Sequence, residues 1–442
     1  MYLPATNRYY AKKRVLTNIT LSAMCCLITA CQTPPPKGIM LDANTYKSIK
    51  NTLLDPTSSA SQAMEDLAES TSTSPDPFQL PAGEKFEFGW CKAPVHNRTL
   101  KDLTNRLTNE SAYARDDSIF YLYSGDHQRL QQAIDRTLAW AKESTLFNGY
   151  QLGMSPELGS FPGIQQGFCN NSWNMMLDSI WQAYGLINFS QVYLTLKQSD
   201  QANSHAEDIT VIHDWLQKQL VPAVNAGLHA WTRWADAHPT SKAYERYRND
   251  NHISWSLAGL AAAALALNDK PLMDYVYEGT AYDDGYSGLY KNPSSLKTQL
   301  ENVISRDGQI YDDPVRTPQH KGFFYGNFSL WALVMATDIA ERAKYPALWN
   351  HHGEQGGSIM TALDYYAPLV AGQQALPDPK EKTQPGFFNF TYQLMLNKTW
   401  LTPEQRQHYR AAANNNRPDR NILQGLGRID LLTTPATHPL RP

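Results

Sequence analysis

The sequence has little charge of either sign and no excess that would attract a polyanion. Only 18% of its 442 residues are charged, and 39 Lys and Arg residues against 42 Asp and Glu residues give a formal net charge of 39 − 42 = −3. Proteins that bind nucleic acid are usually basic on the binding face, so we expect no nucleic-acid partner. The 42% of hydrophobic and 11% of aromatic residues indicate a folded chain rather than a disordered one.

Motifs of metal and nucleophile chemistry are also missing. The mature chain contains no His-Glu-x-x-His, no Gly-x-Ser-x-Gly, no phosphate-binding loop and no dinucleotide fingerprint. The His and Glu residues within 351–354 could be read as metal ligands, but the glycines that follow favour a polar loop. The pairs Asp283-Asp284 and Asp312-Asp313 could suggest an inverting glycoside hydrolase, although adjacent aspartates are more typical of turns. We therefore expect neither a metal nor a cofactor.

The N-terminus has the pattern of an export signal. Basic residues between Arg8 and Arg14 precede an apolar run over 15–30 that is too short and too interrupted to span a membrane well. Residues 27–31, Leu-Ile-Thr-Ala-Cys, resemble the lipobox of bacterial lipoproteins, which implies a signal peptide over 1–30 and acylation of Cys31. Gln32 is similar to the sorting signal for the outer membrane. We expect a periplasmic protein anchored by lipid to the outer membrane of a Gram-negative bacterium, with soluble secretion as the alternative.

Cysteine is scarce beyond this leader. Of five cysteines, only Cys91 and Cys169 lie in the mature chain, and no neighbouring Cys or His completes a metal-ligand set around either thiol. Two cysteines in an exported protein favour one disulfide. Residues 31–84 are rich in Pro, Ser and Thr, which predicts a surface tether ahead of a single domain over 85–442.

Strand-like alternation is scarce as well, and helical periodicity replaces it from residue 86 onward. Apolar residues recur at helical spacing within 130–141, 176–184, 212–224 and 330–339. Residues 254–267 are small and apolar on nearly every face, which predicts an inner helix. Many helices with no sharp second linker favour an all-α fold: an α/α toroid, or incomplete α/α barrel, of antiparallel helix pairs around a central cleft.

Two segments carry a more specific pattern. Residues 250–255 read Asp-Asn-His-Ile-Ser-Trp directly before the small-residue helix, and residues 306–330 combine an Asp-Gly turn, Arg316, Tyr325 and an Asn-Phe-Ser-Leu step. Taken singly, each has a structural explanation: Asn251 and His252 can cap a helix, and Tyr325 can be a core ring.

Together and in this order, the two segments resemble the alginate lyase family of α/α-toroid polysaccharide lyases, which act on polyuronates. The family pattern Asn-Asn-His-x-x-Trp is similar to residues 250–255, with Asp in place of the first Asn. The resemblance extends over about residues 86–377. Two features depart from the family: Phe324 stands where relatives have His, and the interval from Arg316 to Tyr325 is a few residues longer, so Arg306 and Lys321 are reserve candidates for the arginine's role.

The resemblance implies a role for each matched residue. A uronate lyase removes the proton on C5 and expels the glycosidic oxygen on C4, so it must first neutralise the adjacent carboxylate with fixed donors. Asn251 and Arg316 would hold the carboxylate, His252 would neutralise it or act as the base, and Tyr325 would act as acid, or as both acid and base. Further residues would line subsites for the sugar: Trp255, Asn170 and Asn171.

The resemblance therefore implies a polysaccharide lyase that cleaves a uronate-containing polymer, similar to alginate or polymannuronate, by β-elimination to a 4,5-unsaturated product. The expected partner is the acidic polysaccharide, bound by a monomer without metal. Two other functions stay open: a non-catalytic lipoprotein that binds exopolysaccharide, and an α/α-toroid glycoside hydrolase, whose product would be saturated.

Overall fold

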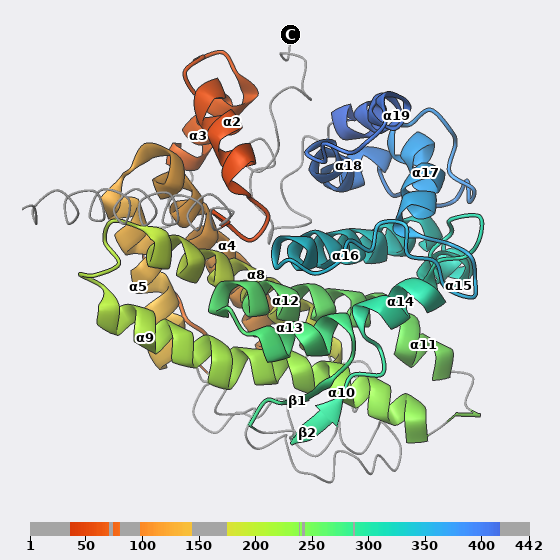
Figure 1. Cartoon of the computed structure of the whole chain (residues 1–442), viewed down its shortest axis with the longest axis horizontal. Coiled ribbons are helices and arrows are strands. Elements are labelled where there is room, and N and C mark those ends of the chain that lie inside the picture. Colours follow the sequence, from red (N-terminus) through yellow and green to blue (C-terminus); the bar gives the residue numbers. More distant parts are fainter. Residues whose placement is uncertain are drawn as a thin grey trace, which may run out of the picture. The chain divides into compact units, whose positions relative to one another are not determined.

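The computed structural model describes residues 36–69, 74–79, 98–143, 175–237, 239–240, 244–285 and 288–415 (Figure 1). The chain divides into the units Met1–Pro36 and Lys37–Pro442, and the helices and strands below all belong to the second. Several predictions fall outside the described residues, namely those for the signal peptide, Cys31, Cys91, Cys169, Asn170 and Asn171. They stay predictions.

The described part of the chain is mainly helical, as the periodicity predicts. In chain order its helices are α2 (Ala43–Thr52), α3 (Ser59–Glu69), α4 (Arg98–Ser124), α5 (His127–Glu143), α8 (Met175–Gln198), α9 (Ala206–Trp215), the π-helix η2 (Leu216–Leu220), α10 (Val221–Ala237), α11 (Tyr244–Asn249), α12 (Asn251–Leu267), α13 (Lys270–Tyr277), α14 (Leu296–Val303), α15 (Asp312–Arg316), the 3₁₀ turn η3 (Thr317–Gln319), α16 (Gly322–Arg342), α17 (Ile359–Val370), the 3₁₀ turn η4 (Pro385–Phe388), α18 (Asn389–Leu396) and α19 (Pro403–Asn414). The strands β1 (Ala281–Asp283) and β2 (Leu289–Lys291) form an antiparallel hairpin with Tyr282 opposite Tyr290. The all-α prediction is confirmed.

Helix α12 is the inner helix that its small residues predict. It packs against α8, α10, α13 and α16, and Figure 1 shows it between α10 and α16. Nearly all of its residues are buried. Gly259 permits the close approach of α8, since a Cβ there would lie 2.9 Å from the Cα of Ala183. Because its residues are apolar or small on nearly every face, α12 can be surrounded by other helices.

The predicted tether is wrong for the described part of residues 37–79. Helices α2 and α3 form there, and their neighbourhood buries Ile39, Leu41, Ile49, Leu67 and Phe78. The polar residues that suggested a linker act in part as helix caps, because Asp42 accepts a hydrogen bond from the backbone of Thr45 and Ser58 accepts one from that of Ser61.

Buried arginines attach this N-terminal segment to the body. Arg129 of α5 donates to the carbonyl oxygens of Leu67 and Ala68 at the end of α3. Arg136 pairs with the buried carboxylate of Glu110 on α4 and also donates to the carbonyl of Ser74. These contacts are made in three dimensions by residues about 60 positions apart, so the local composition of the segment did not reveal them.

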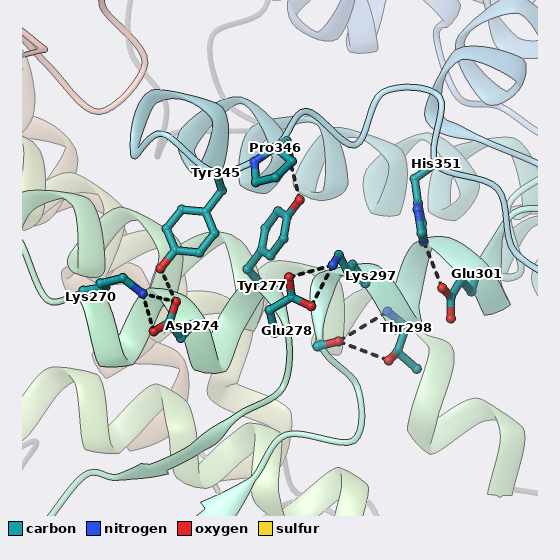
Figure 2. Close-up of polar contacts among 11 residues, drawn as sticks. Lys270, Asp274, Tyr277, Glu278, Lys297, Thr298, Glu301, Tyr345, Pro346 and His351 are labelled. Atoms are coloured by element: carbon teal, nitrogen blue, oxygen red, sulfur yellow. Dashed lines mark hydrogen bonds and ion pairs between the residues drawn. The ribbon is translucent and has the colours of Figure 1, made fainter. Parts of the chain in front are cut away.

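The connection from α16 to α17 is tied to α13 and α14 by polar contacts, which Figure 2 shows. Tyr345 donates to Asp274, and Tyr277 donates to the carbonyl of Pro346 at 2.7 Å. His351 lies 2.9 Å from a carboxylate oxygen of Glu301 on α14. His351 is thus part of a polar loop, as predicted. Among the described residues, no group of His, Cys, Asp and Glu is arranged to hold a metal ion, and no helix is both long and apolar enough to cross a membrane.

Candidate active site

The beginning of α12 carries the first motif. Asp250 is the N-cap: its carboxylate accepts a hydrogen bond from the backbone N–H of His252 at 3.0 Å, and both of its oxygens lie 3.2 Å from Nδ1 of the same histidine. Asp250 and Asn251 are fully buried, whereas the side chain of His252 is 13% exposed. A carboxylate at Nδ1 favours the proton on that nitrogen, which leaves Nε2 as the basic atom of the neutral ring.

The short helix α15 carries two residues that face this motif. Asp312 is its first residue and Arg316 its last, one helical turn apart, with 3.9 Å between Oδ1 of Asp312 and Nε of Arg316. The other carboxylate oxygen of Asp312 lies 3.5 Å from Nδ2 of Asn251. Asp312 thus links the start of α12 to the arginine of the second motif.

The beginning of α16 completes the group. The guanidinium of Arg316 stacks over the ring of Tyr325, 4.6 Å from its centroid. One turn further along α16, the hydroxyl of Ser329 donates to Oδ2 of Asp312 at 2.5 Å. Tyr325 is partly buried, and its hydroxyl makes no hydrogen bond to any residue that the structure describes.

The start of the helix that carries Tyr325 is capped by Glu381, from the segment between α17 and η4. Helix α16 has no capping side chain of its own at Lys321, and Glu381 accepts hydrogen bonds from the backbone N–H groups of Phe323 and Phe324 at 2.9 and 2.8 Å. The ring of Phe324 packs against Phe387 at a centroid distance of 5.5 Å. The phenylalanine that replaces the family's histidine is therefore part of an aromatic contact that fixes the start of α16.

The electrostatics of the group are unusual. Burial raises the pKa of Asp312 to about 7, and the charge of Asp250 adds to this effect; the hydrogen bond from Ser329 and the charges of Arg316 and His252 act in the opposite direction. Burial also raises the pKa of the neighbouring Asp313, whose carboxylate accepts a hydrogen bond from the hydroxyl of Tyr366 at 2.8 Å. Strongly shifted carboxyl groups are characteristic of functional sites.

The structure brings together the four residues of the two motifs. Asn251 and His252 start one inner helix, Tyr325 lies in the first turns of the next, and Arg316 lies between them, joined to Asn251 through Asp312. Both inner helices begin at the same end, beside α15. Their N-termini point partial positive charge at this end, which suits an anionic ligand.

Sequence reasoning missed three supporting residues. Asp312 was expected in a turn, but it starts α15 and lies inside the site. Asp312 and Arg316 are four residues apart, and so are Tyr325 and Ser329. This spacing is the signal that could have identified each pair as neighbours on one face of a helix. Asp250, noted as a departure from the family pattern, is the partner of His252.

The structure does not support a sugar subsite at Trp255. The residue is fully buried, with its ring edge-on to Tyr184 at 4.7 Å and 5.1 Å from the ring of Phe328. It packs beneath the site and cannot touch a polymer. The reserve candidates Arg306 and Lys321 are both exposed, and neither is an observed partner of Asp312.

Residues 60–376, well over half of the chain, match the sequence profile of the family described as alginate lyase. Among solved structures, alginate lyase A1-III from Sphingomonas species A1 is similar, with 13% identity, coverage of 85% of this chain and 92% of that one, and a TM-score of 0.47. An alginate lyase from Bacteroides ovatus has 15% identity, coverage of 82% and 92%, and a TM-score of 0.47. No curated protein matches the chain. The family match shows that the chain belongs to the alginate lyase family, the α/α-toroid polysaccharide lyases.

Proposed function

We propose that this lyase cleaves a uronate-containing polymer, similar to alginate or polymannuronate, by β-elimination to a 4,5-unsaturated product. The observation that carries the proposal is the meeting of Asn251 and His252 with Arg316 and Tyr325 at the N-terminal ends of two inner helices. A variant of alginate lyase A1-III has been solved as a complex with a tetrasaccharide. The family match alone does not give the substrate, so the uronate polymer and the β-elimination both belong to this proposal.

The first requirement of the reaction is to neutralise the substrate carboxylate, because the C5 proton beside an ionised carboxylate is too weakly acidic to be removed. In the proposed mechanism, Arg316 binds this carboxylate with its Nη groups, since its Nε faces Asp312. Asn251, whose side chain is fully enclosed in the free protein, adds a second N–H of its amide once the bound sugar reaches the start of α12. Both groups stabilise the negative charge that develops as the proton leaves, and they are already in place before the reaction begins.

The second requirement is a base near C5 and an acid near the leaving oxygen on C4. Because Asp250 holds Nδ1 of His252, Nε2 can accept a proton, and the buried carboxylate stabilises the imidazolium that results. Tyr325 donates the proton to the leaving oxygen. Where the C5 hydrogen and the C4 oxygen lie on one face of the sugar, Tyr325 also serves as the base, and His252 then neutralises the carboxylate.

A glycoside hydrolase is the second candidate, because Asp312 has the near-neutral pKa that a general acid needs. Its burial argues against this role: both Asp250 and Asp312 are fully enclosed and engaged with other side chains. A carboxyl group that cannot reach the glycosidic oxygen cannot protonate it.

The experiment is an ultraviolet assay of the purified full-length chain, in detergent, on a panel of polymannuronate, polyguluronate and other polyuronates. A lyase product absorbs through its conjugated double bond, whereas a hydrolase product does not. Each polymer is also tested after reduction of its carboxylates to alcohols, which removes the group that Arg316 binds. We expect absorbance to rise with at least one native polymer and with no reduced polymer. Chain cleavage without absorbance, or cleavage of a reduced polymer, would reject β-elimination.

We also propose that the chain is a monomeric lipoprotein of the outer membrane, facing the periplasm. The support is the leader over 1–30 and the lipobox-like sequence that ends in Cys31. The wild type is expected to partition with membranes into detergent, and Cys31→Ser is expected to be soluble or uncleaved. Recovery of the wild type as a soluble protein without acyl chains would contradict the anchor.

A further inference from the structure

Asp312 lies among the residues of both motifs and is itself buried. The side chain is 1% exposed and lies where three helices meet. Each of these helices contributes a partner: Asn251 from α12, Ser329 from α16 and Arg316 from its own helix. The position resembles that of a structural ion pair.

Its contacts are poor for a structural role. Only the bond from Ser329 is short; the distances to Asn251 and Arg316 are 3.5 and 3.9 Å, and Oδ1 accepts no hydrogen bond within the described residues. The charged groups that face Asp312 are Asp250 and His252 from α12 and Arg316 from its own helix, while α16 presents Ser329 and the phenol of Tyr325. A buried carboxylate with one short bond and a second carboxylate nearby destabilises the fold, so its benefit must lie elsewhere.

That benefit is the orientation of two groups that the reaction needs. Asp312 lies on the Nε side of the Arg316 guanidinium, which lies over the ring of Tyr325 and donates from one Nη to Gln319 at 3.5 Å, so the carboxylate helps to fix where the guanidinium lies. The same carboxylate draws Nδ2 of Asn251 toward α15. One anion therefore sets the angles at which both donors meet a substrate carboxylate.

We propose that Asp312 is a positioning residue of this site, whose ionised carboxylate orients Asn251 and Arg316 for the carboxylate of the substrate. The proposal rests on the proposed function, since it assigns Asp312 a task in binding a uronate. The ionised form is the one that orients, so kcat/KM should rise with pH as Asp312 loses its proton.

The test compares Asp312→Asn with a matched control, Asp338→Asn. Asparagine keeps the shape of the side chain and its bond to Ser329 but removes the charge. We expect Asp312→Asn to raise KM and the Kd for an oligouronate by about 10-fold, to lose one inflection near neutral pH from the profile of kcat/KM, and to keep the wild-type Tm or exceed it. Asp338 is a buried, ion-paired aspartate at the other end of α16, so its variant should lower Tm and leave KM, Kd and the pH profile unchanged.

A second variant protects the test from a failure of folding. Ser329→Ala removes the short bond to Asp312 but no charge, and it should raise KM by about 2- to 3-fold, in line with the loss of one hydrogen bond. Wild-type KM, Kd and pH profile in Asp312→Asn would overturn the proposal, as would a loss of activity that follows a fall in Tm. If the wild type bound an oligouronate but did not cleave it, the proposed function would be rejected. The Kd values of the variants would then still decide whether Asp312 orients the two donors. A wild type that neither binds nor cleaves any polyuronate would overturn both.

Discussion

A buried aspartate lies near each end of α16, and the surroundings of these two residues shift their pKa values in opposite directions. At the C-terminal end, Asp338 makes contacts of 2.6 Å with Arg342 and with Lys398, and Lys398 also lies 2.6 Å from Glu341. Burial alone would raise the pKa of Asp338, but the charges of Arg342 and Lys398 lower it below its ordinary value. At the N-terminal end, burial and Asp250 raise the pKa of Asp312 instead.

The difference matches the roles that we propose for the two ends of the helix. Asp338 has two cations at hydrogen-bonding distance, so its ionised form is stable and fastens α16 to α18 through Lys398. Asp312 faces a single arginine at 3.9 Å, and this guanidinium also donates to Gln319 at 3.5 Å. Local conflict in an otherwise satisfied core is characteristic of functional sites, where interactions are completed only when the substrate binds.

The largest effect is expected from Tyr325→Phe, at the functional end. The change keeps the ring beneath Arg316 and removes the hydroxyl that we propose as the proton donor to the leaving oxygen. Turnover should fall by about 100- to 10,000-fold, the usual range for a lost general acid, with little change in Tm or polymer binding. Tyr345→Phe, which removes a hydroxyl bonded to Asp274 near the other end of the helix, is the control and should keep full activity. Near wild-type formation of unsaturated product by Tyr325→Phe would remove this residue from the mechanism.

Asp338→Asn tests the structural end through stability. Arg342 and Lys398 would lose their common anion while still largely buried, which should lower the free energy of unfolding by about 3 kcal/mol. Urea unfolding measures the change, and kcat/KM measured on the same sample shows whether the site is affected. An unchanged free energy of unfolding would show that the ion pairs of Asp338 with Arg342 and Lys398 do not stabilise this end of α16.

The pH dependence of stability separates the two aspartates directly. The folded-state pKa of Asp312 is raised to about 7, so between its ordinary value and neutral pH the folded protein retains a proton that the unfolded chain has released. The free energy of unfolding therefore falls as the pH rises through this range. Between about pH 5 and about pH 8, the wild type should lose roughly 2 to 3 kcal/mol that Asp312→Asn keeps. Parallel stability curves for the two proteins in urea would contradict the raised pKa.

The smallest effect is expected from Glu381→Gln, which weakens the cap that fixes the start of α16. Glutamine offers one acceptor where glutamate offers two, and it carries no charge to complement the helix dipole. Stability should fall by about 1 kcal/mol, with a modest loss of turnover because Tyr325 is held less firmly. Glu354→Gln, in an exposed turn, is the control. A variant as stable as the wild type would show that the phenylalanine contacts alone fix the helix start.

Particular residues show how far the sequence could be interpreted. Helical periodicity and the small residues of 254–267 predicted the inner helix correctly, because both patterns follow from burial on a helix and need no partner to be known. Trp255 was misplaced because its exposure depends on the rings of Tyr184 and Phe328 on other helices. The composition of residues 37–79 suggested a tether because Ser, Thr and Pro are common both in linkers and at the ends of helices. The buried arginines that attach this segment to the body lie elsewhere in the chain.

By itself the sequence determined the helical class, the family and the four residues of the two motifs, since each depends on residue type and local spacing. Only the tertiary structure decided that Asp250 is the partner of His252, that Asp312 joins the motifs and that Glu381 caps α16. The first is a local contact at the start of α12, whereas the other two join residues about 60 positions apart, and the free energy of a buried carboxylate is set by the charges that surround it in space. Two aspartates of the same sequence chemistry, Asp312 and Asp338, consequently have opposite pKa shifts.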